Sequence, residues 1–317
     1  MTRSLCPTCF KEIDAEIIVA DKVYMAKICP EHGSFVGIVE KDPQWFKYCQ
    51  DLGCNNIYNG YMIDVTGKCN LKCKYCYHDN TGGHRPTKEI LRDAMGCLNL
   101  APFILSGGEP TLHPDLPHII DRLTDCAETW ILSNGIELCD KHYFNELCKA
   151  GLIQIPGIVN VGLSIHKESN GKDMEFLELC RHNQLKAGSV FYVIDSVDQI
   201  SDAIALFKEY RTSIYSMRIK AASNLWNESG ALNKIFVSDM LAYFCSMGPT
   251  QIMNGAPFFN KVSYANIMHD GLLFHLISWY DATNVDLMDI DCPPYHKGKD
   301  GKIRNLAASF IMNGKPQ

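Results

Sequence analysis

The chain has 317 residues, with 46% apolar and 21% charged residues. These values exclude a disordered chain, a collagen-like repeat and a long coiled coil. The formal net charge of -6 and the pI near 6.0 provide no bulk attraction to nucleic acid, so we expect no nucleic-acid partner. The sequence has neither an apolar run of about 18 residues nor an apolar leader, so we expect a cytoplasmic protein without a membrane span.

Three blocks follow one another along the chain: a cysteine-rich block over 1–60, an alternating block over 61–222 and a third block over 223–317. The chain contains fifteen cysteines. In a reducing compartment, cysteines serve as metal ligands or buried thiols more often than as disulfides. We therefore expect the clustered cysteines to bind metal.

The first block contains two short metal-binding motifs, Cys-Pro-Thr-Cys at 6–9 and Cys-Pro-Glu-His at 29–32. Between them, 17–19 and 23–25 predict a small hairpin. Two such motifs can hold one metal ion tetrahedrally, as in zinc ribbons and rubredoxin. The predicted ligands are Cys6, Cys9 and Cys29, with His32, Cys49 or Cys54 as the fourth. A histidine would favour zinc, whereas a fourth cysteine would suit zinc or iron.

The second block alternates short β-like runs with amphipathic helical stretches, which is typical of parallel strands covered by helices. Predicted strands span 61–65, 103–105, 129–132, 160–165, 189–194 and 216–220. Predicted helices between them include 87–99, 141–150, 174–184 and 201–210. Six βα steps predict an α/β fold, a partial (β/α)6 TIM-like barrel, in which ligands bind at the carboxyl ends of the strands.

In the third block the alternation stops. Runs at 261–269 and 272–280 flank Asp270-Gly271, a dipeptide that suits a type I′ turn. We therefore expect a β-hairpin in a C-terminal cap that closes the barrel mouth. For Cys292 two interpretations stay open, a structural thiol and a ligand or hydrogen donor.

The strongest motif is a CxxxCxxC run formed by Cys69, Cys73 and Cys76, directly after the first predicted barrel strand. Three thiolates in eight residues can hold one corner of a [4Fe–4S] cluster, and no fourth cysteine lies in the loop to ligate the remaining iron. A zinc site or buried thiols are the alternatives. A zinc site normally pairs its ligands in two halves.

This run resembles that of the radical S-adenosylmethionine (SAM) enzymes, in which the unligated iron chelates SAM. Two further segments are similar to that family: Gly-Gly-Glu-Pro at 107–110 and Leu-Ser-Asn-Gly at 132–135. Both follow predicted barrel strands. An aromatic residue before the last cysteine is also typical of the family. The SAM-contacting residues that the resemblance implies are Tyr75, Gly107, Gly108, Glu109, Ser133 and Asn134.

Strand alternation adds inward-facing polar residues. On the fourth strand Ser164 shares a face with His166, and we expect Ser164 to contact the cofactor. His166 is either a hydrogen-bonded structural histidine or a substrate contact. On the sixth strand Arg218 and Lys220 face the same way. An inward arginine needs an anion, so Arg218 is predicted to meet the SAM carboxylate or an acidic substrate group.

The resemblance implies an enzyme whose reduced cluster cleaves SAM to a 5′-deoxyadenosyl radical. That radical would abstract hydrogen from a small-molecule or lipid substrate, leading to carbon–carbon bond formation, group transfer or rearrangement. A reduced flavodoxin- or ferredoxin-type protein is the implied electron donor. Two other functions stay open: a radical SAM enzyme that modifies peptides or proteins, and a non-catalytic iron–sulfur or zinc protein that senses redox state.

The first block is similar to the start of the archaeal tetraether lipid synthase and its methyltransferase-like relatives, which also carry CPxC and CPxHG motifs. This chain departs from that pattern in its tail, which holds only Cys245 and Cys292. Two cysteines are too few for further cysteine-bound clusters. We therefore expect the cofactors to be one [4Fe–4S] cluster, SAM and one zinc or iron ion, and a lipid-coupling activity is not favoured.

Overall fold

The computed structural model describes residues 1–317 except 53–59, 74, 77, 79–80, 223–233, 254–262, 280, 288–294, 299–300, 306–308, 310 and 312–317. It divides into two compact units. The parallel unit comprises Asn59–Tyr192 and Asp202–Arg218; the ribbon unit comprises Met1–Tyr58, Val193–Ser201 and Ile219–Gln317. None of the described helices is long and apolar enough to cross a membrane.

The parallel unit is built on strands that run side by side in chain order. They are β5 (Tyr61–Thr66), β6 (Phe103–Gly107), β7 (Thr129–Ser133), β8 (Ile158–Ser164), β9 (Lys186–Ile194) and the start of β10 (Met217–Ala221). The pairs from β5 to β9 are parallel. Next to β9, the Val190 N–H donates to the Ser216 carbonyl at 2.9 Å. The predicted α/β fold is confirmed, with strand ends shifted by a few residues.

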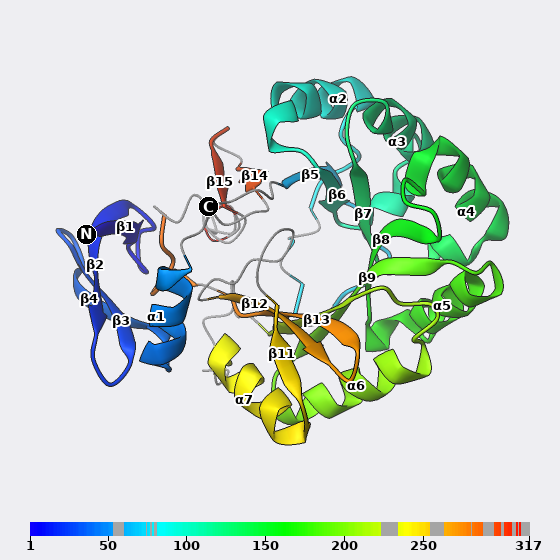
Figure 1. Ribbon diagram of the computed structural model, residues 1–317. Helices are drawn as coiled ribbons and strands as arrows, with labels where there is room; N and C mark the ends of the chain where they lie inside the picture. The colour runs from blue at the N-terminus through cyan, green and yellow to red at the C-terminus, as the bar shows by residue number, and fades with distance from the viewer. Residues whose placement is uncertain are drawn as a thin grey trace. The chain divides into compact units, whose positions relative to one another are not determined.

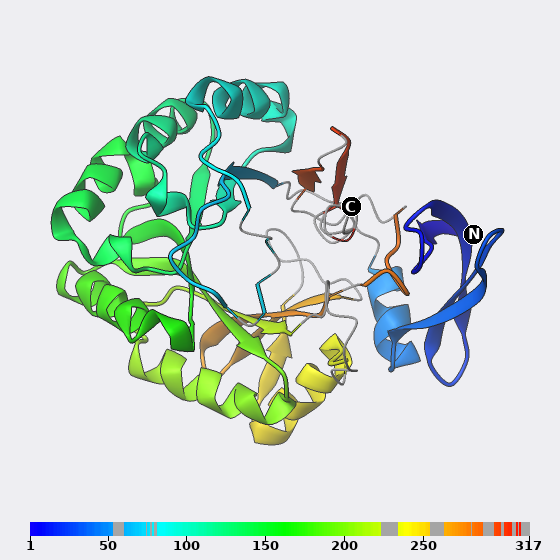
Figure 2. The same cartoon turned by 180° about the vertical axis from the view of Figure 1, so that it is seen from behind.

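Helices of this unit lie outside its strands in both views of Figures 1 and 2. They are α2 (Thr87–Gly96), α3 (Leu116–Thr124), α4 (Lys141–Leu147), α5 (Lys172–His182) and, from Asp202 onward, α6 (Ile200–Glu209). Helix α3 shows why they pack this way, because Leu116, Ile119, Ile120 and Leu123 repeat at helical spacing and are all fully buried. The apolar faces of these helices cover the strands, and polar residues are found at the ends of the strands.

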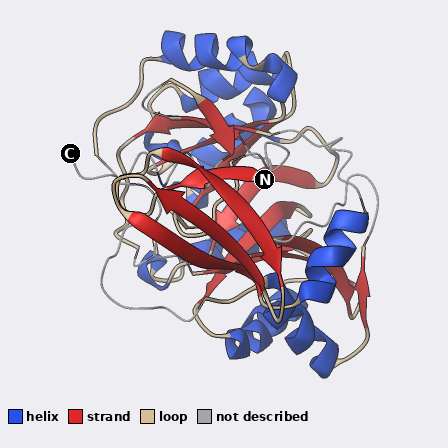
Figure 3. Ribbon diagram, turned by 90° about the vertical axis from the view of Figure 1, so that its left-hand side faces the viewer, coloured by secondary structure: helices blue, strands red, loops and turns tan. Residues whose placement is uncertain are grey.

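The ribbon unit begins with an antiparallel sheet of four strands in chain order, larger than the predicted hairpin. The strands are β1 (Thr2–Leu5), β2 (Glu12–Val19), β3 (Val23–Cys29) and β4 (Gly33–Glu40). Figure 3, in which strands are red, shows this sheet at the N label. Helix α1 (Pro43–Asp51) follows, capped by the Asp42 carboxylate, which accepts from the Gln44 N–H at 2.8 Å.

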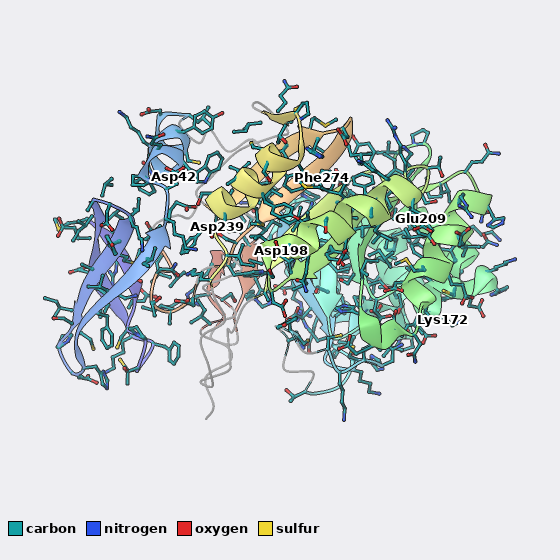
Figure 4. The ribbon with its side chains drawn as sticks, turned by 90° about the horizontal axis from the view of Figure 1, so that it is seen from below. Asp42, Lys172, Asp198, Glu209, Asp239 and Phe274 are labelled. Atoms are coloured by element: carbon teal, nitrogen blue, oxygen red, sulfur yellow. The ribbon has the colours of Figure 1, made fainter. Side chains whose placement is uncertain are left out.

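The later part of the ribbon unit contains the predicted hairpin. Its elements are β11 (Thr250–Ile252), β12 (Tyr264–His269), β13 (Leu272–Ile277), α7 (Val237–Met247), β14 (Tyr295–Lys297) and β15 (Ile303–Asn305). Asp270 and Gly271 have φ of 50° and 71°, the two left-handed positions of a type I′ turn. Phe244 of α7 packs on Phe274 of β13, with centroids 5.0 Å apart; Figure 4 labels Phe274. The hairpin prediction is confirmed.

Segment 281–287 docks on the ribbon sheet within this unit. The Lys27 ammonium donates to the Ala282 carbonyl at 2.6 Å, and the Asn284 amide donates to the Ile38 carbonyl at 2.7 Å. Leu5 and Val285 are fully buried in a shared cluster. The ribbon therefore folds together with a segment more than 200 residues away in the chain.

Candidate metal centres and cofactor site

The cysteine loop starts at the carboxyl end of β5 and closes on itself before α2. Its base is narrow, because the Gly67 N–H donates to the Gly83 carbonyl at 2.9 Å and a Cβ at Gly67 would lie 2.0 Å from the Thr81 carbonyl oxygen. The three cysteines in the loop are half-buried: Cys69, Cys73 and Cys76. The loop therefore presents three thiols at the end of the first barrel strand, where the sequence predicts a cluster.

The electrostatics of the loop disfavour thiolates in the metal-free chain. Burial raises the pKa of Cys69. Burial, followed by the negative charges of Glu168 and of the neighbouring thiolates, raises the pKa of Cys73 to about 12. The thiols influence one another because they lie close together. A bound iron–sulfur cluster would supply the positive charge that lets them ionise.

Two glycines bring the end of β6 against the start of the cysteine loop. The Gly108 N–H donates to the Thr66 carbonyl at 2.7 Å, and the Glu109 N–H donates to the Lys68 carbonyl at 2.8 Å. A Cβ at Gly107 would meet the Thr66 oxygen at 2.2 Å, and one at Gly108 would meet the Lys68 oxygen at 2.1 Å. Gly107 also has φ of 117°. Side chains at these two positions would force the strand end and the loop apart.

Glu109 joins the ends of β6 and β7. Its side chain is 2% exposed. One carboxylate oxygen accepts from the Thr111 hydroxyl at 2.6 Å and the Ser133 hydroxyl at 2.9 Å, and the other accepts from the Asn134 N–H at 2.8 Å. Burial raises the pKa of Glu109, and these donors oppose that rise. Glu109 is therefore held in place, with one oxygen that accepts a single hydrogen bond among the described residues.

Asn134 continues this network back to the cysteine loop. Its amide donates to the Asn70 side-chain oxygen at 2.8 Å, and the Asn70 amide donates to Glu137 at 3.2 Å. Neither Asn70 nor Thr111 was among the residues predicted from the sequence. Asn70 lies between two predicted cluster ligands, and Thr111 lies two residues after Glu109, the spacing of a side-chain cap. These sequence positions were the signals from which the two residues could have been predicted.

The remaining predicted contacts lie on other elements of the parallel unit. Ser164 is half-buried at the end of β8, and Tyr75 is half-buried in the cysteine loop. The Arg218 guanidinium lies 5.2 Å from the Phe191 ring centroid. Its Nε is buried without a hydrogen-bond partner among the described residues. The hydrogen bonds described above join the loop, Glu109 and Asn134, and they do not extend to Ser164 or Arg218.

The loop cysteines fit a [4Fe–4S] cluster, and the charges of Glu109 and Arg218 suit the two ionic groups of an amino acid. Three thiols can hold three irons, and the described loop offers no fourth cysteine. The Glu109 carboxylate suits an ammonium group, and the unpartnered Arg218 Nε suits a carboxylate. The amino-acid part of SAM carries both groups.

The ribbon contains a second cysteine cluster. Ligand atoms of Cys6, Cys9, Cys29 and His32 all lie within 4.8 Å of one another. His32 Nδ1 is 3.7 Å from Cys6 Sγ and 3.4 Å from Cys29 Sγ. Tetrahedral zinc, with Zn–S of about 2.3 Å and Zn–N of about 2.0 Å, would place such atoms about 3.5 Å apart. The four side chains therefore fit one zinc ion.

Of the other candidates for the fourth ribbon ligand, the structure describes Cys49, which is buried on α1 and is not in this group. Cys54 lies outside the described residues, and so does Cys292, whose role the sequence left open. Burial would raise the pKa of the Cys6 thiol, but hydrogen bonds from the Cys9 and Thr8 backbone N–H groups and from the neighbouring thiols lower it to about 6. The Thr8 N–H lies 3.4 Å from Cys6 Sγ. The hydrogen bonds of the ribbon therefore favour the thiolate form of Cys6.

Family models match both regions. Residues 1–41 match the HMPTM N-terminal zinc ribbon domain, and residues 63–210 match the radical SAM superfamily. The chain is 32% identical over 190 residues to 7,8-dihydro-6-hydroxymethylpterin dimethyltransferase of Methanocaldococcus jannaschii, covering 49% of this chain and 38% of that protein. It is 37% identical over 106 residues to a probable GTP 3′,8-cyclase of Archaeoglobus fulgidus, covering 31% and 34%.

The chain thus spans little more than a third of the length of these two relatives. Among solved structures, Streptococcus suis SuiB bound to the precursor peptide SuiA shares 15% identity with a TM-score of 0.46, covering 64% of this chain and 48% of that chain. The sequence matches cover the ribbon and the parallel strands.

Proposed function

Since the chain carries a radical SAM domain behind a zinc ribbon, we propose that it is an enzyme that cleaves SAM reductively to a 5′-deoxyadenosyl radical and abstracts hydrogen from a small molecule. The observation that carries the proposal is the contact between Gly107–Glu109 and the cysteine loop. Through this contact the end of β6, which carries the buried Glu109, lies against the start of the loop that carries the three thiols.

The residues have distinct roles in this proposal. Cys69, Cys73 and Cys76 would hold the cluster, which supplies the electron for cleavage when reduced. Glu109 would accept from the SAM ammonium group, and Asn134 would hold the ribose side of the ligand against the loop through Asn70. Arg218 would meet the SAM carboxylate or an acidic substrate group, supported by its buried, unpartnered Nε.

For the substrate, we propose a fused nitrogen heterocycle of the pterin or purine type. One relative is named for a dihydropterin and the other for GTP, and both molecules contain a fused aminopyrimidinone ring. The corresponding reaction is transfer of a methyl group to such a ring from a second SAM molecule. The first SAM takes one electron and leaves as methionine and 5′-deoxyadenosine, which carries the hydrogen abstracted from the ring. The resulting ring radical takes the methyl group of the second SAM, which leaves as S-adenosylhomocysteine on uptake of a second electron from the reductant. A lipid is the other substrate class of the sequence prediction, and a peptide or protein would be the substrate under its enzymatic alternative.

The test is anaerobic turnover of the cluster-loaded chain with dithionite and SAM labelled in its methyl group. We expect 5′-deoxyadenosine, and we expect its formation to rise when a dihydropterin is added, with label entering the pterin. The matched control is the chain with all three loop cysteines changed to alanine. A loaded chain that binds SAM but forms no 5′-deoxyadenosine with any candidate would favour the non-catalytic alternative. Stimulation by a peptide or lipid instead would overturn the substrate class alone.

A further inference from the structure

Two side chains that follow β8 lie close to Cys73 of the cysteine loop. One ring nitrogen of His166, one carboxylate oxygen of Glu168 and the Sγ of Cys73 all lie within 4.8 Å of one another. His166 and Glu168 follow β8, about 90 residues after Cys73 in the chain. Neither has a role in the proposed cleavage of SAM.

The backbone of this turn is fixed. The His166 N–H donates to the Asp173 carboxylate at 2.9 Å, and Asp173 is 3% exposed at the start of α5. The Ser169 N–H donates to the His166 carbonyl at 3.1 Å. These contacts hold His166 half-buried, so its position beside Cys73 follows from the fold of the turn.

The two side chains act on the Cys73 sulfur with opposite electrical sign. An imidazole ring can offer an N–H donor to a nearby sulfur, and one ring nitrogen of His166 lies within 4.8 Å of Cys73 Sγ. A Glu168 carboxylate oxygen lies within the same distance of that sulfur and offers an acceptor in place of a donor. A donor near the sulfur stabilises added negative charge on a cluster, whereas a carboxylate opposes it.

We propose that His166 and Glu168 set the reduction potential of the cluster held by Cys73, with His166 raising it and Glu168 lowering it. The inference rests on the proposed function only in that Cys73 ligates a cluster. The step concerned is the uptake of one electron by the oxidised cluster from an external reductant. No covalent bond forms or breaks in that step. Both residues are positioning residues that act through the Cys73 sulfur.

The experiment is an EPR-monitored redox titration of the cluster-loaded chain without SAM, with dithionite and mediator dyes. His166→Leu removes the donor and should lower the midpoint potential, whereas Glu168→Gln removes the charge and should raise it. His166→Gln keeps an N–H donor and should return the potential toward that of the parent. Glu146→Gln changes an exposed carboxylate on α4 and should leave the potential unchanged. If His166→Leu does not hold a cluster, His166→Phe removes the donor while keeping a ring.

Shifts of opposite sign in the two variants, with rescue by His166→Gln, support the inference. Unchanged potentials in chains with full iron content would overturn it, as would shifts of the same sign. Absence of any cluster signal in the parent chain would instead contradict the proposed function. Iron content and the EPR amplitude of the parent therefore separate the two failures.

Discussion

The two cysteine sites of this chain differ in how far their ligands are prepared for metal. In the ribbon, four ligand atoms already lie within 4.8 Å, and hydrogen bonds lower the pKa of Cys6 to about 6 against the effect of burial. In the loop, burial and nearby negative charge raise the pKa of Cys73 to about 12. The ribbon thus holds its four ligand atoms together and lowers the pKa of Cys6, whereas the loop raises the pKa of Cys69 and Cys73.

The difference matches the two roles. A structural metal gains from ligands that the fold has already placed, because binding energy then becomes folding energy. In the ribbon that fold includes segment 281–287, which is held by Lys27 and Asn284. The loop instead packs through glycines against strand ends that carry the proposed cofactor contacts. Its cysteines are the proposed ligands of a cluster that must leave one iron open.

The largest effect is expected when the three cysteines of the loop are removed. Changing Cys69, Cys73 and Cys76 to alanine should remove about four irons per chain and abolish 5′-deoxyadenosine formation. The ribbon ion should stay, because its ligands lie elsewhere. Iron, zinc and sulfide analysis with product chromatography measures this. Equal iron in parent and variant would refute the assignment of the loop.

The converse change removes a ribbon ligand. Cys29→Ser should lose the ribbon ion and lower the unfolding temperature, since structural zinc in small domains contributes on the order of 10 kcal/mol of apparent binding free energy. The loop cluster should still form. Cys245→Ser changes an exposed cysteine on α7 outside the group and is the control. Full zinc content in Cys29→Ser would contradict the site.

A smaller effect is expected at Glu109. Glu109→Gln removes a charge-assisted contact worth about 1.5–3 kcal/mol, so SAM should bind roughly tenfold or more weakly to the cluster-loaded chain. Calorimetric titration of SAM measures this, with Glu146→Gln as the control. An unchanged affinity for SAM would show that Glu109 does not contact SAM. Its role would then be limited to the hydrogen bonds that join the ends of β6 and β7.

Asn284 tests whether segment 281–287 supports the ribbon. Asn284 is fully buried, and Asn284→Ala would leave the Ile38 carbonyl without its donor. We expect a loss of about 1–3 kcal/mol in the free energy of unfolding. Urea unfolding checks this, with the exposed Asn145→Ala as the control. A loss no larger than that of Asn145→Ala would show that the segment does not stabilise the ribbon.

The smallest effect is the pH dependence of the metal-free chain. The lowered pKa of Cys6 contributes stability above the ordinary thiol value, and this contribution is lost as pH falls through about 6. The raised pKa of Cys73 acts in the other direction, because stability is lost as pH rises above the ordinary thiol value toward about 12. Unfolding curves across pH for the parent and for Cys6→Ser and Cys73→Ser should separate the two. If the free energy of unfolding falls with decreasing pH in the same way for the parent and for Cys6→Ser, the lowered pKa of Cys6 would be contradicted.

Much of the architecture could be predicted because local patterns determine it. Alternation located the parallel strands, and Asp270-Gly271 located the hairpin. Sequence could not choose between His32 and Cys49, since both lie close enough in the chain to reach the ribbon. The choice depends on α1, which holds Cys49 away from the ligand group.

Contacts between distant segments were beyond prediction for a different reason. Glu168 and Cys73 approach one another only because the ends of β5 and β8 face the same edge of the unit. Segment 281–287 reaches the ribbon through backbone carbonyls, which carry no residue-specific signal in a sequence. A single sequence without such signals cannot indicate these pairs.

The most direct test of the difference between the two sites is a zinc titration of the metal-free, reduced chain at neutral pH, followed by calorimetry. We predict one tightly bound zinc per chain, with the same stoichiometry and affinity when the three loop cysteines are serine. Binding that is lost in the loop variant, or that persists when Cys6, Cys9 and Cys29 are serine, would show that the ribbon is not the prepared site and would contradict this account.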